Sequence, residues 1–324
     1  MMIVFGIFLA TLLVIVGIAI VQTPNLFVAV MLSGIFSLLL ASNFFLLDAA
    51  DVALTEAAVG AGISTVLLLA ALALTIDRET APTTKPILAL IVVITTILIV
   101  VYATFDQPRL GDPYAPTQQH VAPWYLEKTP EAIDIPNVVT AVLGSYRGYD
   151  TLGEVFVVYT AGIGVLFLMS ARTQNRRKPS TRVRGLRHYL IPRLVGRMLI
   201  PFILLFGLYV QFHGEYSPGG GFQAGAIIAA SMILYALLEA EERALKVLPL
   251  SLLRILMAFG ALLYGSVGVL GMLLGGNFLD YSVLSSNPVS GQQWGLLLIE
   301  AGVGITVTGV LLSIFHAFAA REKG

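Results

Sequence analysis

The chain has no cysteine among its 324 residues, and only 12% of its residues are charged. The absence of cysteine excludes disulfide bonds, thiolate metal sites, cysteine-ligated iron–sulfur clusters and a cysteine nucleophile. Any redox chemistry would therefore have to be supplied by another chain. Lys and Arg balance Asp and Glu, 19 against 19, and this zero net charge argues against a nucleic acid partner.

Hydrophobic side chains are abundant instead, at 57% of the residues, and the mean hydropathy is +0.88. Soluble domains contain roughly 45–50% apolar and about 25% charged residues, so this composition indicates a chain whose main solvent is lipid. The first apolar run has no basic region before it and no small-residue cleavage pattern after it, which predicts a retained helix and not a signal peptide.

Long apolar runs predict an all-α, multi-pass membrane protein. A bilayer core of roughly 30 Å requires about 20 apolar residues in a helix, and helices satisfy their own backbone hydrogen bonds in lipid. Nine runs meet this length, at 2–21, 26–46, 50–75, 86–105, 151–171, 189–211, 221–239, 250–273 and 294–318. Very short turns join the first three, which predicts antiparallel neighbours.

Two polar segments interrupt the apolar runs. Six prolines lie within 106–136, which predicts a loop outside the membrane that cannot continue a helix. The following segment, 137–150, is interpreted as a short interfacial helix. The second break is the Arg-rich stretch 172–187, which is typical of a linker between two membrane modules.

The distribution of Lys and Arg predicts the orientation. Placing 172–188 in the cytoplasm puts 16 of the 19 basic residues on or near that side, and leaves Arg109, Lys128 and Arg147 outside. With nine spans, the N-terminus is then outside and the C-terminus is cytoplasmic.

Ionisable side chains inside a bilayer cost roughly 2.5–3.5 kcal/mol or more each, so those within the predicted spans are candidates for function. Glu56 lies about two turns into the third span, soon after Asp51, and small residues around it leave room for a neighbouring helix or for water. We expect a role in proton or cation relay, against the alternative of a structural hydrogen bond. Glu154 opens the fifth span and is balanced between a relay and a structural role, because Asp150 and Thr151 beside it are also typical helix-capping residues.

Glu300 lies in the last span, and its face of the helix continues through Gly304, which predicts a carboxylate directed at a neighbouring helix or a cavity. It is the strongest candidate in the second half of the chain. His316, further along the same span, is interpreted as a satisfied interfacial histidine and not as a proton carrier.

A glycine-rich loop precedes the seventh span, with Gly219, Gly220 and Gly221 in succession. Consecutive glycines permit backbone conformations that other residues avoid, and free amides at the start of the next helix are able to face an anion or a carboxylate. His213 and Glu215 add titratable groups at the outer surface. Such a loop is a weak signal alone, because it also serves as a tight turn.

These residues together carry a resemblance. The run 213–225, with Leu238 and Glu239 closing the span and with 299–304 later, resembles the MrpB (MnhB) subunit of Mrp-type sodium/proton antiporters over about 188–320. The run 51–62 resembles the MbhD-like region near the C-terminus of MrpA, and 146–154 resembles the MbhE-like region that follows it. The chain therefore looks like the tail of MrpA fused ahead of MrpB.

The resemblance implies four parts. They are an MbhD-like region of four helices over 1–105, an outer loop with an MbhE-like helix over 106–171, a basic cytoplasmic linker over 172–187, and an MrpB-like domain of four helices over 188–324.

The resemblance also implies an assembly with the large antiporter-like A and D subunits and the small C, E, F and G subunits, in the cytoplasmic membrane of a prokaryote. Transported sodium and protons, with bound lipids, would be the ligands, and no cofactor is expected. By this analogy Glu56 is a hydrated relay carboxylate, and the MrpB-like half, which includes the candidate Glu239, helps to form a sodium pathway.

Other functions compete with an antiporter subunit. The same modules occur in redox-driven complexes such as a membrane-bound hydrogenase, and a purely structural scaffold would use every carboxylate for packing. A membrane enzyme is disfavoured, because no HExxH, GxSxG or paired-histidine pattern occurs in any predicted span. The spans also contain no mid-membrane Lys, so the main pump core is expected in another chain.

Overall fold

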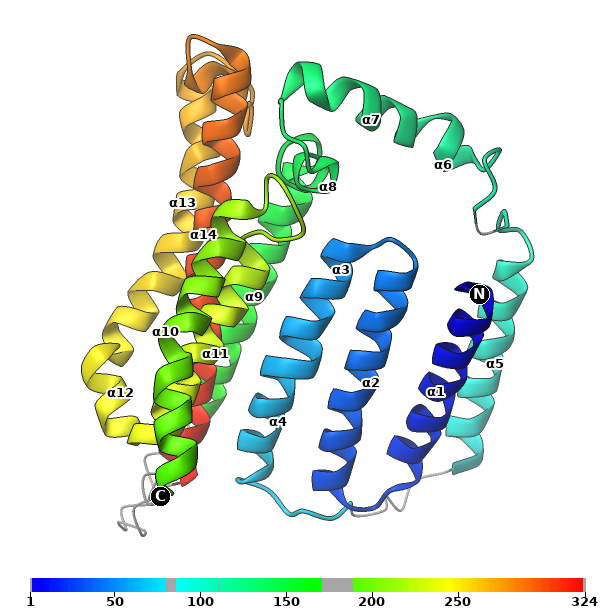
Figure 1. Cartoon of the computed structure of the whole chain (residues 1–324), viewed down its shortest axis with the longest axis vertical. Helices are drawn as coiled ribbons and strands as arrows, with labels where there is room; N and C mark the ends of the chain where they lie inside the picture. The colour runs from blue at the N-terminus through cyan, green and yellow to red at the C-terminus, as the bar shows by residue number, and fades with distance from the viewer. Residues whose placement is uncertain (1, 80–85, 110, 171–188, 323–324) are drawn as a thin grey trace.

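The computed structural model describes residues 2–79, 86–109, 111–170 and 189–322, and these residues are almost entirely helical (Figure 1). Within these ranges, nine helices are long and apolar enough to cross a membrane, as the sequence predicts. They are α1 (Met2–Gln22), α2 (Leu26–Leu46), the composite α3–η1–α4 (Ala50–Leu72), α5 (Pro86–Thr104), α9 (Gly148–Ser170), α10 (Leu190–His213), α11 (Gly221–Glu239), α13 (Leu250–Leu273) and α14 (Pro288–Glu322). The basic stretch 172–187 lies outside the described residues.

The third membrane span changes its helical form in the middle. It begins as α3 (Ala50–Thr55), continues as the π-helix η1 (Glu56–Ser64) and ends as α4 (Thr65–Leu72). Glu56 is the first residue of the π-helical part. Segments of π-helix are rare and frequently occur at functional sites, and hydrophobic periodicity alone did not reveal this one.

The proline-rich segment differs from its prediction. It contains α6 (Pro116–Gln119) and the 12-residue α7 (Val121–Ala132), so it is not a loop without helix. Two prolines are tolerated by position: Pro116 is the first residue of α6 and Pro123 lies in the first turn of α7, where backbone N–H groups need no intrahelical partner. Pro130 lies inside α7, two residues before its end. The next segment forms α8 (Val138–Ala141) and η2 (Val142–Tyr146), which confirms the predicted short helix there.

Eight of the nine described spans form two groups, α1–α4 and the helices α9, α10, α11, α13 and α14, whereas α5 is exposed from Ile87 to Thr104 (Figure 1). In the second group α14 is central, because it packs against α9, α11 and α13. The third span of the first group packs against α11 and α14, and Ile63 is buried there together with Ile233 and Leu312. This contact brings the acidic start of α3 beside the glycine-rich loop before α11.

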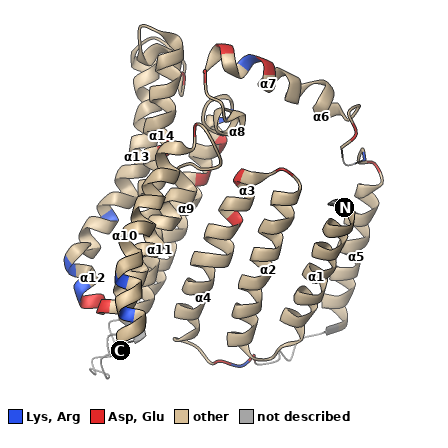
Figure 2. Ribbon diagram, in the orientation of Figure 1, with Lys and Arg blue, Asp and Glu red and all other residues tan. Residues whose placement is uncertain are grey.

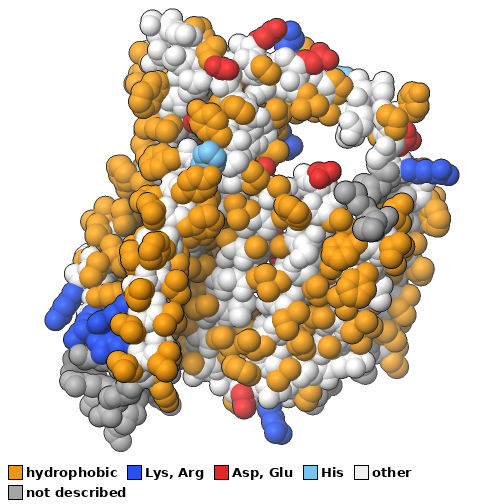
Figure 3. Space-filling view, viewed as in Figure 1, with side chains coloured by type: hydrophobic (Ala, Val, Ile, Leu, Met, Phe, Trp, Pro, Cys, Tyr) orange, Lys and Arg blue, Asp and Glu red, His pale blue; other side chains and the backbone are white. Residues whose placement is uncertain are grey.

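The two ends of the helices differ in character. At one end, called the loop end here, lie α6–α8, the 214–220 loop and the 274–287 connection; at the other, the basic end, lie the 73–79 segment and α12 (Glu241–Val247). Figure 2 shows Lys and Arg gathered along the lower part of α10 and around α12, at the basic end. Hydrophobic side chains cover much of the face in Figure 3, as expected for helices that contact lipid.

Candidate ion-binding cavity

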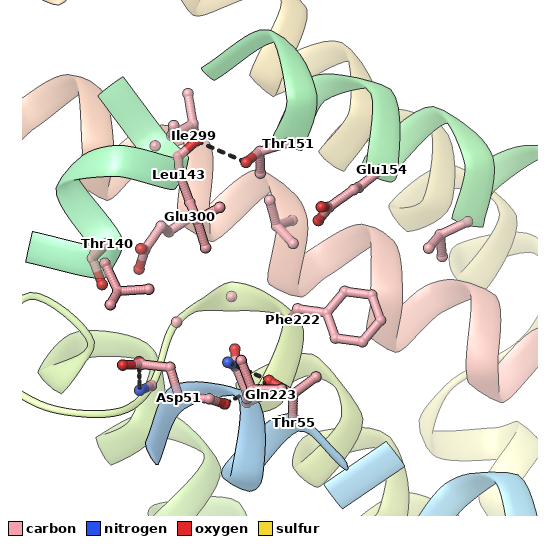
Figure 4. Close-up of a pocket in the computed structure, with 18 of the residues that line it drawn as sticks. Asp51, Thr55, Thr140, Leu143, Thr151, Glu154, Phe222, Gln223, Ile299 and Glu300 are labelled. Atoms are coloured by element: carbon pink, nitrogen blue, oxygen red, sulfur yellow. Dashed lines mark hydrogen bonds between the residues drawn. The ribbon is translucent and has the colours of Figure 1, made fainter. Parts of the chain in front are cut away.

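A cavity of about 570 Å³ lies toward the loop end, where α3, α8, η2, α9, α14 and the start of α11 meet. Three acidic residues line it: Asp51 from α3, Glu154 from α9 and Glu300 from α14. Figure 4 shows Glu154 and Glu300 on one side of the pocket, and Asp51 beside Gln223 on the other. Residues more than 200 positions apart in the chain thus share one cavity.

Asp51 is fixed by hydrogen bonds from two other segments. Its Oδ1 accepts from the Nδ2 of Asn137 at 3.3 Å and from the backbone N–H of Gly219 at 3.3 Å. The Asn137 amide also donates to the carbonyl oxygens of Gly214 at 3.0 Å and Ser217 at 3.1 Å. The expectation that an amide of the glycine-rich loop faces a carboxylate is therefore confirmed at Gly219.

The glycines of this loop are required by geometry at two positions. Gly220 has a φ of +128°, a conformation that residues with a Cβ rarely adopt. A Cβ on Gly221 would collide with the carbonyl oxygen of Glu300 and would lie 2.9 Å from the N of Gly304. The absence of side chains thus lets the start of α11 lie directly against the backbone of α14.

Glu300 is half-buried beside the same loop. A Cβ placed on Gly220 would lie 3.6 Å from the Oε1 of Glu300, so the carboxylate lies against the loop backbone. In the part of the chain that the structure describes, none of Asp51, Glu154 and Glu300 forms an ion pair with Lys or Arg. A carboxylate without a fixed cation is able to change its partner, whether a proton or a metal cation.

Hydroxyl and amide groups complete the polar lining, and the sequence did not single these out as functional. The Nε2 of Gln223 donates to the Oγ1 of Thr55 at 2.8 Å, and Thr151 donates to the carbonyl oxygen of Leu143 at 2.8 Å. The Thr140 hydroxyl, buried beside the loop, donates to the carbonyl oxygen of Gly214 at 2.7 Å. The only signal available for Gln223 was its place directly after the glycines, in an otherwise apolar helix.

The three carboxylates line the cavity without meeting at one point. Among the residues that the structure describes, no three His, Cys, Asp or Glu side chains come close enough to hold one metal ion together. Successive occupation of separate carboxylates fits this spacing better than a single closed coordination sphere.

Other candidate residues lie outside the cavity lining. Glu56 is half-buried, and its carboxylate lies beside Gly60, near the hydroxyl of Ser37 in α2. His213 stacks with Tyr209 and Tyr216, at ring-centroid distances of 4.6 and 5.7 Å. Glu56 therefore lies at the contact between the third span and α2. His213 lies at the outer surface.

Glu215 is half-buried in the 214–220 loop. Burial raises the pKa of this carboxyl group above its ordinary value of 4.5. The group therefore takes up a proton more readily than an exposed glutamate would.

Glu239 lies far from the other candidates, at the basic end. Its side chain is 2% exposed and forms ion pairs with Arg193 at 2.8 Å, with Arg243 at 2.6 Å and with Arg197. Three guanidinium groups around one buried carboxylate hold it in the charged form, which is typical of a structural anchor between helices.

Comparison with known proteins gives matches over both halves of the chain. Residues 191–313 match a family model described as a domain related to the MnhB subunit of Na⁺/H⁺ antiporters, and residues 11–76 match the MbhD model, which describes a subunit of MBH. The chain is 34% identical over 137 residues to proteins named as putative antiporter subunit mnhB2 in Staphylococcus aureus strains Newman and COL. That alignment covers 41% of this chain and 96% of the relative.

Two solved structures resemble the fold. One chain of the Mrp complex from Dietzia sp. DQ12-45-1b is 26% identical with a TM-score of 0.76, and the match covers 96% of this chain. This chain spans 34% of that longer chain. A chain of the membrane-bound sulfane sulfur reductase, an archaeal respiratory membrane complex, is 28% identical with a TM-score of 0.53, covering 70% of this chain and 97% of that one.

Proposed function

The chain belongs to the MnhB family of Na⁺/H⁺ antiporter subunits, and from this premise we propose that its loop-end cavity forms part of the ion pathway of the assembled antiporter. It is a multi-pass protein of a prokaryotic membrane, and other Mrp antiporter subunits are its partners. In this proposal they are the large A and D subunits and the small C, E, F and G subunits.

One observation supports the proposal above all: three carboxylates without Lys or Arg partners, from three distant segments, line a single cavity. Oxygen ligands suit hard cations such as Na⁺, and carboxylates also carry protons. Asp51, Glu154 and Glu300 would be occupied in succession as an ion moves between the loop end and the protein interior. Glu56 lies in the π-helix that follows α3, and it would pass protons within the α1–α4 group.

The chain contributes to the pathway without containing the main pump core. The nine described spans contain no lysine, whereas a core built on paired lysine and carboxylate residues needs one. We assign it no enzymatic reaction, because the carboxylate, hydroxyl and amide groups that line the cavity fit the binding and transfer of ions.

The test uses inverted membrane vesicles that contain the whole antiporter complex, with sodium-dependent dissipation of a proton gradient as the measurement. Glu300→Gln, Asp51→Asn and Glu56→Gln are compared at matched levels of assembled complex. We expect Glu300→Gln to lose about tenfold or more of the exchange rate, equal to about 1.4 kcal/mol on the barrier, because an amide cannot bind and release a proton.

Glu131→Gln is the matched control, because Glu131 is an exposed glutamate of α7 that pairs with the exposed Lys128. It should exchange at the wild-type rate. Full activity in all the cavity variants would contradict the proposal and would reduce the chain to a scaffold.

The match to a respiratory complex favours a second candidate, a membrane-arm subunit of a redox-driven ion pump. The two functions differ in their energy source. Sodium-driven proton movement in vesicles without any electron donor supports the antiporter, whereas ion movement that requires a donor supports the redox-driven complex.

A further inference from the structure

A buried histidine lies at the basic end of α14, far from the cavity. The side chain of His316 is 3% exposed, and its Nδ1 makes no hydrogen bond. The Oε1 of Glu241, at the start of α12, lies 3.5 Å from this Nδ1, and the Glu241 side chain is only 10% exposed.

A second polar group without a hydrogen bond lies one turn before this histidine. Ser313 is 1% exposed and its Oγ has no partner. Three residues separate Ser313 from His316, so both lie on the same side of α14. Buried polar atoms are nearly always hydrogen-bonded in proteins, often through an ordered water, and two such atoms together mark a place for a water or a transferable proton.

Charged side chains of α10, α11, α12 and α13 lie at the same end of the molecule as His316. Glu239 of α11 faces Arg193 and Arg197 of α10 and Arg243 of α12, so three positive charges surround one negative charge close to Glu241 in the chain. Arg254 is exposed near the start of α13. The ring of Phe315, in α14, stands edge-on to the imidazole of His316, with the ring centroids 5.5 Å apart. When His316 is protonated, its imidazolium pairs with the Glu241 carboxylate, the acidic group that lies 3.5 Å from it.

We propose that His316 and Glu241 form a second proton-binding site, at the opposite end of α14 from Glu300. This inference rests on the proposed function, because it adds an entry for protons on the basic side of the same module. Sixteen residues separate Glu300 from His316, or about 24 Å along the helix, which is most of a bilayer core of roughly 30 Å. Ser313 and a water would carry the proton on from the pair toward the interior of the helix bundle.

The test measures sodium exchange by the whole complex in vesicles while the pH is varied only on the side that the basic end faces. The exchange rate of the wild type should change with the pH on that side. His316→Gln should flatten this response, because the amide does not titrate. His120→Gln, which replaces an exposed histidine of the α6–α7 segment, should keep the wild-type profile.

The pH profile separates a proton site from a structural role, which would lower the rate equally at every pH. An unchanged profile in His316→Gln would overturn the inference, and would leave the proposed function intact if Glu300→Gln still lowers the exchange rate as proposed above. If His316→Gln does not assemble, Glu241→Gln decides in the same way, since it removes the charged partner and keeps the side-chain shape.

Discussion

The carboxylates of this chain occupy two different environments at the scale of single residues. Glu239 is surrounded by three guanidinium groups and carries a fixed charge. Asp51 receives hydrogen bonds from an asparagine amide and a glycine N–H, and Glu300 lies against the backbone of the same loop. Three arginines occupy the Glu239 carboxylate, whereas Asp51 and Glu300 pair with no Lys or Arg among the described residues and remain available to an incoming cation. The first environment suits anchoring and the second suits ion relay.

Glu239→Gln should destabilise the protein without acting directly on the ion pathway. The change leaves Arg193, only 25% exposed, without its buried carboxylate, and we expect a loss of about 1–3 kcal/mol. Arg197 and Arg243 are 48% and 44% exposed and regain water, which limits the cost. The measurement is the thermal unfolding midpoint of the purified complex. An unchanged midpoint would contradict the anchoring role, and Glu131→Gln in the exposed pair with Lys128 serves as the neutral reference.

Close approach of two backbones matters most at the scale of helices. The start of α11 lies against α14 because Gly221 and Gly225 present no side chain to Glu300, Gly304 and Val307. Small residues at such contacts are typical of helix pairs in membranes, where packing rather than water drives association. The same contact places Glu300 at the edge of the cavity.

Gly221→Ala should therefore force α11 and α14 apart. The added methyl group would meet the carbonyl oxygen of Glu300, and overpacking of this kind costs about 1–3 kcal/mol. We expect a lower yield of assembled complex and a lower unfolding midpoint. Gly164→Ala in α9 is the matched control, because nothing lies within 4 Å of a Cβ at that position. Equal yields from the two variants would show that the close approach is dispensable.

The two ends of the whole molecule differ in charge and define its orientation. The helix α1 begins toward the loop end and α14 ends at the basic end, as an odd number of spans requires (Figure 1). The excess of Lys and Arg predicts that the basic end faces the cytoplasm.

Labelling can test this orientation directly, because the chain has no native cysteine. Ser286 lies in the exposed connection before α14, and Lys246 lies in α12 at the opposite end. Each is replaced by cysteine in a separate variant. In intact cells, a maleimide that cannot cross membranes should label Ser286→Cys readily and Lys246→Cys only after permeabilisation. The reverse pattern would invert the proposed orientation.

The sequence by itself determined the nine spans and their approximate ends. The bilayer core has a set thickness, so the length and composition of an apolar run suffice to predict a span such as α2. The helix α5 is exposed from Ile87 to Thr104, so packing within this chain was not needed to predict it. The glycine-rich loop and the acidic residues Asp51, Glu154 and Glu300 were likewise visible as candidates.

Only the tertiary structure decided which of these residues act together. Asp51 and Glu300 line one cavity because α3 and the rest of its span pack beside α11 and α14. No local sequence pattern predicts a contact between segments so far apart in the chain. Glu239 and His316 looked alike in sequence as polar residues near the ends of apolar runs, yet one is surrounded by three arginines and the other has an Nδ1 without a hydrogen bond. The charge that a buried group carries depends on neighbours from other helices, and those neighbours are set by packing in three dimensions.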